Sequence, residues 1–80
     1  MTLSFSRRSI KFLAKCGLKT RTVIIEAIGE LPGKGDIRKL KGQTIKNTFR
    51  LRVGKYRVVY VDDGDEIRIL KIDTRGDIYR

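Results

Sequence analysis

The hydrophobic pattern of this 80-residue chain changes near Lys46 from a helical repeat to strict alternation. Before that point, apolar residues recur every three or four positions in two segments, which contain Ile10, Leu13 and Ala14, and then Val23, Ile24, Ala27, Ile28 and Leu31. After it, apolar and polar residues alternate from Thr48 to Val53. The first repeat is typical of amphipathic helices and the second of strands with one buried face. The chain is therefore predicted to place two helices before most of its sheet.

Capping and breaking residues mark the ends of the two helices. Ser6 can cap a first helix that runs to about Lys15, where Gly17 breaks it. Thr20 is expected to cap the second helix, and Pro32 stops it because proline cannot continue a helix.

Two tight turns separate the later strands. Gly54-Lys55 suits a type II′ turn and Asp63-Gly64 a type I′ turn. We expect strands at residues 48–53, 56–61 and 66–72, after a short first strand that contains Leu3 and Phe5. Residues 37–42 are ambiguous, and residues 74–80 are expected to form a short last strand or an extended end. The order β-α-α-β-β-β predicts one α+β domain over residues 1–80, with two helices on one face of a three- to five-stranded antiparallel sheet.

The turns also predict which side chains share a face of the sheet. With two-residue loops, the facing pairs are Arg52 and Arg57, Leu51 and Val58, and Val59 and Arg68. The helix-covered face would then carry Phe49, Leu51, Val53, Tyr56, Val58, Tyr60, Ile67 and Ile69. The opposite face would carry Arg50, Arg52, Arg57 and Arg68 among Val59, Val61 and Leu70, with no acid between them.

Four arginines on one face favour anion binding over a merely solvated surface. Like charges directly opposite one another destabilise a sheet, and clustered positive charge attracts phosphate-like ligands. The alternative is that the arginine stems cover apolar neighbours while the charged ends stay in water.

The overall composition restricts the function further. Nineteen Lys and Arg residues against nine Asp and Glu give a net charge of +10, which favours a polyanionic or acidic partner. The chain has no histidine and one cysteine, so it can form no internal disulfide and neither a typical zinc site nor a histidine base is expected. No apolar run approaches the roughly 20 residues that span a bilayer, and the first residues do not resemble a signal peptide. We expect a cytoplasmic protein with no metal or other cofactor.

Three segments resemble the RelE/ParE toxin superfamily: Leu40–Gly42, Phe49–Tyr60 and Lys71–Arg80. The likeness covers nearly the whole chain and is closer to RelE-type mRNA interferases than to ParE-type gyrase poisons. It implies a toxin that enters the ribosomal A site and cleaves mRNA without a metal, through attack of the RNA 2′-hydroxyl on the adjacent phosphate.

The resemblance also implies roles for individual residues. Arg50 and Arg52 match basic positions that hold the RNA backbone and the reacting phosphate. Arg57 matches an arginine that stabilises the phosphorane, and Arg75 one associated with the leaving 5′-oxygen. Tyr79 matches an aromatic residue that stacks on a base.

Further RNA contacts are expected from Lys39 and Lys41 at the rim and from Arg68 on the sheet. The general base stays open, because many relatives have lysine or histidine where this chain has Arg50, Arg52 or Thr74. The remaining candidates for the base are Tyr79, Lys41, Asp73 and Asp77.

The implied partners are the ribosome, mRNA and a cognate antitoxin, which is acidic, partly disordered when free, and blocks the site by wrapping the toxin. Operator DNA would be contacted only through the antitoxin, and no membrane is involved. Two alternatives remain: a ParE-like inhibitor of DNA gyrase, and a catalytically inactive, basic nucleic-acid-binding domain.

Overall fold

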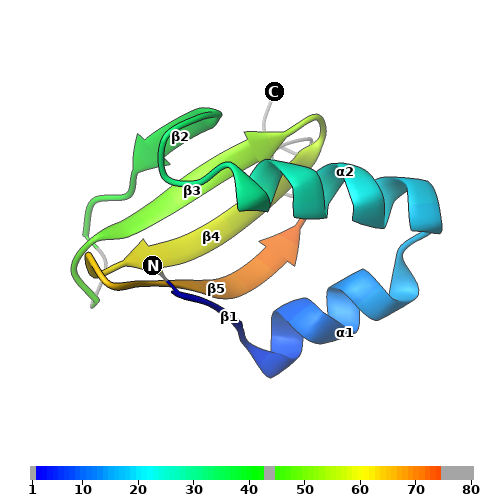
Figure 1. Ribbon diagram of the computed structural model, residues 1–80, viewed down its shortest axis with the longest axis horizontal. Helices are drawn as coiled ribbons and strands as arrows, with labels where there is room; N and C mark the ends of the chain where they lie inside the picture. Colours follow the sequence, from blue (N-terminus) through cyan, green and yellow to red (C-terminus); the bar gives the residue numbers. More distant parts are fainter. Residues whose placement is uncertain (1, 43–44, 75–80) are drawn as a thin grey trace.

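The computed structural model describes residues 2–42 and 45–74, in which two helices cover one face of a five-stranded sheet (Figure 1). Along the chain lie β1 (Thr2–Phe5), α1 (Arg7–Lys15), α2 (Leu18–Gly29), β2 (Asp36–Lys39), β3 (Thr48–Val53), β4 (Tyr56–Asp62) and β5 (Glu66–Asp73). The spatial order of the strands is β1-β5-β4-β3-β2. The predicted α+β fold is confirmed, and the ambiguous segment contains β2. No helix in the described part of the chain could cross a membrane.

One strand pairing differs from the expected antiparallel sheet. β1 runs parallel to β5, whereas the other three pairs are antiparallel, so the sheet is mixed. Hairpin turns fix the direction of β4 against β3 and of β5 against β4. β1 instead leaves the sheet through α1, so no turn sets its direction.

The start of α1 is tied to β5 through Ser6, the predicted N-cap. Its hydroxyl oxygen accepts a hydrogen bond from the Ser9 amide at 3.1 Å, and the hydroxyl donates to the carbonyl of Leu70. The Ser6 amide also donates to the Ile69 carbonyl at 2.8 Å. One residue therefore caps the helix and attaches it to the sheet.

The buried side of α1 differs from the apolar pattern. Leu13 is buried as predicted, but Ile10 is 55% exposed and Ala14 is exposed. Ser9 is buried instead, and its hydroxyl donates to the Ser6 carbonyl at 2.9 Å. A hydroxyl with a backbone acceptor can be buried at little cost, and counting apolar residues does not detect it.

Both ends of α2 differ from the prediction. The helix begins at Leu18 with Gly17 as its N-cap, two residues before the expected cap Thr20, and it ends at Gly29. The Arg21 side chain donates to the Leu13 carbonyl at 2.7 Å, which ties the first turn of α2 to α1. This tertiary contact supports an early start without a side-chain cap.

The predicted helix-covered face of the sheet is confirmed. All eight residues belong to the hydrophobic core or pack against it: Leu51, Val58, Tyr60, Ile67 and Ile69 are buried, and Phe49, Val53 and Tyr56 pack beside them. Ile24 and Ile28 supply the core from α2.

The β3–β4 hairpin has the predicted register, including Arg52 opposite Arg57. Gly54 has φ of 60°, as the first central residue of a type II′ turn requires. The β4–β5 turn is longer than predicted, and Val61, not Val59, lies opposite Arg68.

Carboxylates explain the longer β4–β5 turn. The Asp63 carboxylate accepts hydrogen bonds from the amides of Asp65 at 3.0 Å and Glu66 at 2.8 Å, and Asp62 accepts one from Gly64 at 3.0 Å. The bonds from Glu66 and Asp65 hold the pKa of Asp63 below its ordinary value. Aspartate side chains that bond nearby backbone compete with the type I′ geometry.

A bulge in β5 reverses the side-chain alternation after Ile69. Tyr60 of β4 lies opposite Ile69 of β5. Val59, which precedes Tyr60, lies opposite Lys71, so Leu70 is the extra residue of β5. Ile72 consequently enters the core, and Lys71 and Asp73 point to the other face. The hydroxyl of Ser6 binds the carbonyl of this extra residue.

We predict that Ser6→Ala lowers the free energy of unfolding by about 1–2 kcal/mol, because the helix loses its cap and its bond to the bulge. Urea denaturation followed by circular dichroism would measure this. Thr22→Ala is the control, since that exposed hydroxyl bonds only the Leu18 carbonyl within its own helix. Equal stability of wild type and Ser6→Ala would contradict the assigned role.

We predict that Gly35→Ala is destabilising by about 1–3 kcal/mol. Gly35 has φ of +121°, and an added Cβ would lie 2.6 Å from Cδ1 of the buried Leu51. Gly33→Ala is the matched control, because the nearest atom to its Cβ would be 3.9 Å away. Thermal denaturation should show a lower midpoint for Gly35→Ala and an unchanged or slightly higher one for Gly33→Ala.

Candidate functional site

The face of the sheet opposite the helices, which we call the open face, collects basic side chains from four strands. Its cations are Arg38, Arg50, Arg52, Arg57, Arg68 and Lys71. Strands place side chains more reproducibly than loops do, so these groups have defined positions.

The strand registers arrange the cations in rows across the sheet. One row runs Arg38, Arg50, Val59, Lys71, and the next runs Asp36, Arg52, Arg57, Asp73. Two guanidinium groups thus occupy the centre of the second row, and a carboxylate lies at each end.

Carboxylates on the open face correct the expectation that no acid lies among the arginines. Asp73 accepts from Arg57 at 3.0 Å and lies 4.0 Å from the Lys71 amine. Arg50 lies 3.6 Å from the Asp36 carboxylate and donates to the Asp36 carbonyl at 3.2 Å. Glu66 lies 3.7 Å from Arg68. Six cations against these three carboxylates leave the described part of the open face positive.

Arg57, like Arg50, is a largely enclosed cation of the open face. Its side chain is only 20% exposed, and the Asp73 carboxylate fixes its orientation. Its Nε atom is buried without a hydrogen-bond partner among the described residues. A buried donor without an acceptor costs free energy, so its retention suggests a functional role.

The structure brings together three of the five predicted catalytic residues. Arg50, Arg52 and Arg57 lie on adjacent strands and on the same face. Arg75 and Tyr79 lie outside the described residues. The catalytic roles of all five stay predictions.

The predicted RNA-binding residues are spread over different surfaces. Arg68 lies on the open face and its side chain is 47% exposed. Lys39 is opposite Phe49, so it projects on the helix side of the edge strand, and Lys41 is exposed in the following loop. Their contacts with RNA stay predictions.

Sequence reasoning named Asp73 only as a candidate base, and it did not place Arg38, Lys71 or Asp73 on the open face. Arg38 lies in the ambiguous segment that forms β2. For Lys71 and Asp73, the sequence contains a signal of the face on which they lie. The apolar doublet Ile69-Leu70 shifts the alternation of the strand by one residue. Such a shift is typical of a bulge, which redirects the side chains after it.

Apart from the carboxylates of Asp36, Glu66 and Asp73, few described groups near the arginines can exchange a proton. Burial, with a smaller contribution from Asp62, raises the pKa of Tyr60, which stacks on Phe49 in the core at a centroid distance of 5.5 Å. Lys71 contributes the only amine on the described open face, and lysine, unlike arginine, can exchange a proton. No three His, Cys, Asp or Glu side chains within residues 2–42 and 45–74 are grouped to hold a metal.

We predict that single-stranded RNA binding depends strongly on salt. Five phosphate contacts would give a slope of log K against log salt of about −3.5, and Lys71→Gln should reduce its magnitude by about 0.7. Fluorescence anisotropy over a salt series measures the slope. Lys19→Gln, an exposed lysine on α2, should leave it unchanged. Equal effects of the two substitutions would exclude Lys71 from the contact surface.

A comparison with family models matches residues 3–79 to a model described as the ParE toxin of the type II toxin-antitoxin system parDE. No curated protein sequence matches the chain.

Several solved structures share the fold. The RelB-RelE antitoxin-toxin complex from Methanococcus jannaschii contains a chain with 32% identity and a TM-score of 0.74, covering 94% of this chain and 93% of that one. The RelE-RelB complex from Pyrococcus horikoshii gives 29% identity and a TM-score of 0.75, with 94% of each chain covered. The chromosomal ParDE system of P. aeruginosa gives 20% identity and a TM-score of 0.64, covering 92% of this chain and 95% of that one, which shows a common fold.

Proposed function

The chain belongs to the ParE toxin family of type II toxin-antitoxin systems, within the RelE/ParE superfamily, and we propose that it is a ribosome-dependent endoribonuclease that cleaves mRNA. The observation that carries this proposal is the pair Arg52 and Arg57, which face each other on the open face beside Arg50. Like charges held directly opposite one another favour an anionic ligand between them.

The proposed reaction needs charge stabilisation more than covalent participation by the protein. The 2′-hydroxyl of the RNA attacks the adjacent phosphorus, the bond to the 5′-oxygen breaks, and the products are a cyclic phosphate and a free 5′-hydroxyl. Negative charge accumulates on the phosphoryl oxygens, and fixed guanidinium donors stabilise it. Arg57, which Asp73 holds in place, is our choice for the residue nearest this charge.

Proton transfer requires groups other than the arginines, whose pKa is too high for them to act as a base. We propose Lys71 as one candidate proton donor, because its ammonium group shares the carboxylate of Asp73 with Arg57. Arg75 remains our candidate for stabilising the leaving oxygen, and Tyr79 our candidate for stacking on a base.

The partners in this proposal are an antitoxin, the ribosome and its mRNA, in the cytoplasm. The similar solved chains from M. jannaschii and P. horikoshii are toxins in complex with RelB, which supports a cognate antitoxin for this chain. We propose that operator DNA is contacted only through that antitoxin.

A second candidate function is inhibition of DNA gyrase. The description of the matching family model and the common fold of the ParDE system support it. The identity of 32% to a RelE chain leads us to favour RNA cleavage. The third candidate is a basic domain that binds nucleic acid without cleaving it.

We predict that expression of the chain without an antitoxin arrests growth, and that cuts in mRNA map within translated codons. Arg57→Ala should relieve the arrest, because the loss of one charge-stabilising donor costs about 10²–10³ in rate. The matched control is Arg7→Ala, an exposed arginine on α1 that should keep full toxicity.

The other functions give different outcomes. Intact mRNA together with double-strand breaks in DNA would identify a gyrase inhibitor. Intact mRNA and intact DNA, with RNA binding retained, would identify a non-catalytic domain. Circular dichroism of Arg57→Ala would establish that the loss of toxicity does not come from unfolding.

A further inference from the structure

One carboxylate of the open face lies directly beside the central pair of arginines. Asp73 is the neighbour of Arg57 across the β4–β5 strand pair, and its Oδ2 atom accepts a hydrogen bond from the Arg57 guanidinium at 3.0 Å. The same oxygen lies 4.0 Å from the Lys71 amine. The Asp73 side chain is 26% exposed, so a ligand can reach a carboxylate whose position is fixed.

The proposed RNA cleavage needs a group that takes the proton of the attacking 2′-hydroxyl. Guanidinium and ammonium groups are donors with no acceptor atom, so the cations of the open face cannot take it in their charged form. The described part of the open face otherwise offers three carboxylates, those of Asp36, Glu66 and Asp73. A carboxylate is therefore the group there that can accept the proton.

The positions of the three carboxylates separate them. Asp36 lies on the edge strand β2, at the far end of its row from Asp73, and its side chain is 57% exposed. Glu66 lies at the opposite end of the eight-residue strand β5, roughly 20 Å from Asp73 at about 3.3 Å per residue, and pairs with Arg68. Of the three, Asp73 is the one that contacts Arg57, the residue that we place nearest the phosphoryl charge.

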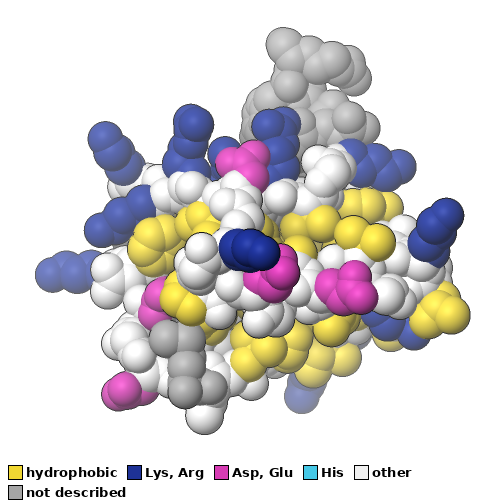
Figure 2. All heavy atoms as spheres, turned by 45° about the horizontal axis from the view of Figure 1, so that its top comes forward, with side chains coloured by type: hydrophobic (Ala, Val, Ile, Leu, Met, Phe, Trp, Pro, Cys, Tyr) yellow, Lys and Arg dark blue, Asp and Glu magenta, His cyan; other side chains and the backbone are white. Residues whose placement is uncertain are grey.

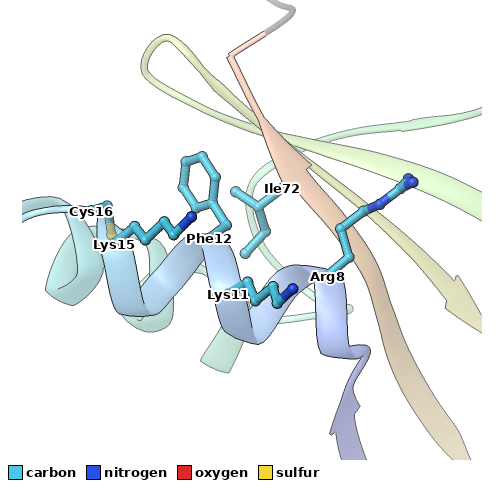
Figure 3. A pocket seen from close by; sticks show the side chains of 6 residues that line it. All are labelled: Arg8, Lys11, Phe12, Lys15, Cys16 and Ile72. Atoms are coloured by element: carbon cyan, nitrogen blue, oxygen red, sulfur yellow. The ribbon is translucent and has the colours of Figure 1, made fainter.

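Packing on the helix side fixes the direction of Asp73. Because of the β5 bulge, Ile72 enters the core, and Figure 3 shows it beside Phe12 of α1. Neighbouring residues of a strand point to opposite faces, so Lys71 and Asp73 both project onto the open face. The bulge thus brings an amine and a carboxylate of one strand to the same face, next to Arg57.

A carboxylate at this position reduces the affinity of the open face for a polyanion, because like charges repel. Acidic side chains are uncommon in this chain, and Figure 2, an oblique view over the helices, shows single Asp and Glu side chains scattered among Lys and Arg side chains. A neutral amide could also accept the hydrogen bond from Arg57 without that repulsion. Removal of a proton, in contrast, requires the carboxylate of Asp73.

We propose that Asp73 is the general base of the RNA cleavage, an inference that rests on the function proposed above. Its carboxylate takes the proton of the 2′-hydroxyl while the bond from the 2′-oxygen to phosphorus forms. The bond from phosphorus to the 5′-oxygen breaks, and its electron pair stays on that oxygen, which takes a proton from the Lys71 ammonium. Proton transfer from Asp73 back to Lys71, whose polar atoms lie 4.0 Å apart, then restores both groups without a co-reactant.

The test is single-turnover cleavage by the full chain on purified ribosomes programmed with a defined mRNA. Asp73→Asn should lower the rate about 10²–10⁴-fold, because the amide can still accept from Arg57 but does not take the proton. The matched control is Asp65→Asn, an exposed acid in the β4–β5 turn, which should cleave like the wild type. An mRNA with a 2′-deoxynucleotide at the mapped cleavage site measures binding alone, which should be unchanged or tighter for Asp73→Asn.

A second variant separates proton removal from the placement of Arg57. Asp73→Glu keeps a carboxylate but lengthens the side chain, whereas Asp73→Asn keeps the length and loses the carboxylate. A general base predicts faster cleavage by the glutamate variant, and a positioning role predicts faster cleavage by the asparagine variant. Circular dichroism should show the wild-type fold for both.

A sulfur substitution in the RNA distinguishes the base from the proton donor. An mRNA with a 5′-bridging phosphorothiolate at the cleavage site has a leaving group that departs without a proton. This substrate should restore the rate of Lys71→Gln, whereas Asp73→Asn should stay slow because its step precedes departure of the leaving group.

Three outcomes would overturn the assignment of the base. They are a cleavage rate of Asp73→Asn close to that of the wild type, a loss of binding that accounts for the whole loss of rate, and recovery of Asp73→Asn on the phosphorothiolate. Intact mRNA with the wild-type chain would instead overturn the proposed function and the base assignment together. Wild-type cleavage with a fully active Asp73→Asn would leave the proposed function standing and refute only the base.

Discussion

The attachment of the Ser6 hydroxyl to the Leu70 carbonyl fixes the relation between α1 and the sheet. The same hydroxyl accepts from the Ser9 amide, so it satisfies the first turn of α1 and the bulged part of β5 at once. A bulge leaves backbone groups without their regular partners, and a side chain that binds there stabilises the irregularity. The directions of Lys71, Ile72 and Asp73 all depend on that bulge, so the open face and this end of the core rest on one local arrangement.

The open face also shows how a small domain tolerates concentrated charge. Its core is thin, and like charges across a strand pair reduce stability. Asp36 and Asp73 lie at the two ends of the row that contains Arg52 and Arg57, so they offset part of this repulsion. They also orient Arg50 and Arg57 without removing the excess of positive charge. Carboxylates in such positions are compatible with anion binding, because the centre of the row remains cationic.

The sequence was informative wherever local rules agree with the packing. Alternation and a glycine that tolerates positive φ were sufficient for the β3–β4 hairpin, its register and the Arg52–Arg57 pair. The helical repeat identified the buried residues Ile24 and Ile28 of α2. These features depend on residues close together in the chain, and period and turn chemistry describe them well.

The predictions from the sequence are wrong where tertiary contacts or polar side chains override the local pattern. Ser9 is buried through hydrogen bonds, and Gly17 begins α2 without a side-chain cap while the Arg21 side chain ties the helix to α1. Asp63-Gly64 predicted a tight turn between β4 and β5. The turn is longer because the Asp63 carboxylate accepts hydrogen bonds from backbone amides within it. A count of apolar residues includes none of these interactions, because each uses a backbone group whose availability depends on the fold.

The end of β5 connects the open face with the hydrophobic core. Successive residues of a strand point to opposite faces, so Lys71 and Asp73 contribute to the open face while Ile72 contributes to the core. Asp73 fixes the guanidinium of Arg57 at 3.0 Å, and the intervening backbone is short. The packing of Ile72 in the core therefore helps to fix the carboxylate that orients Arg57.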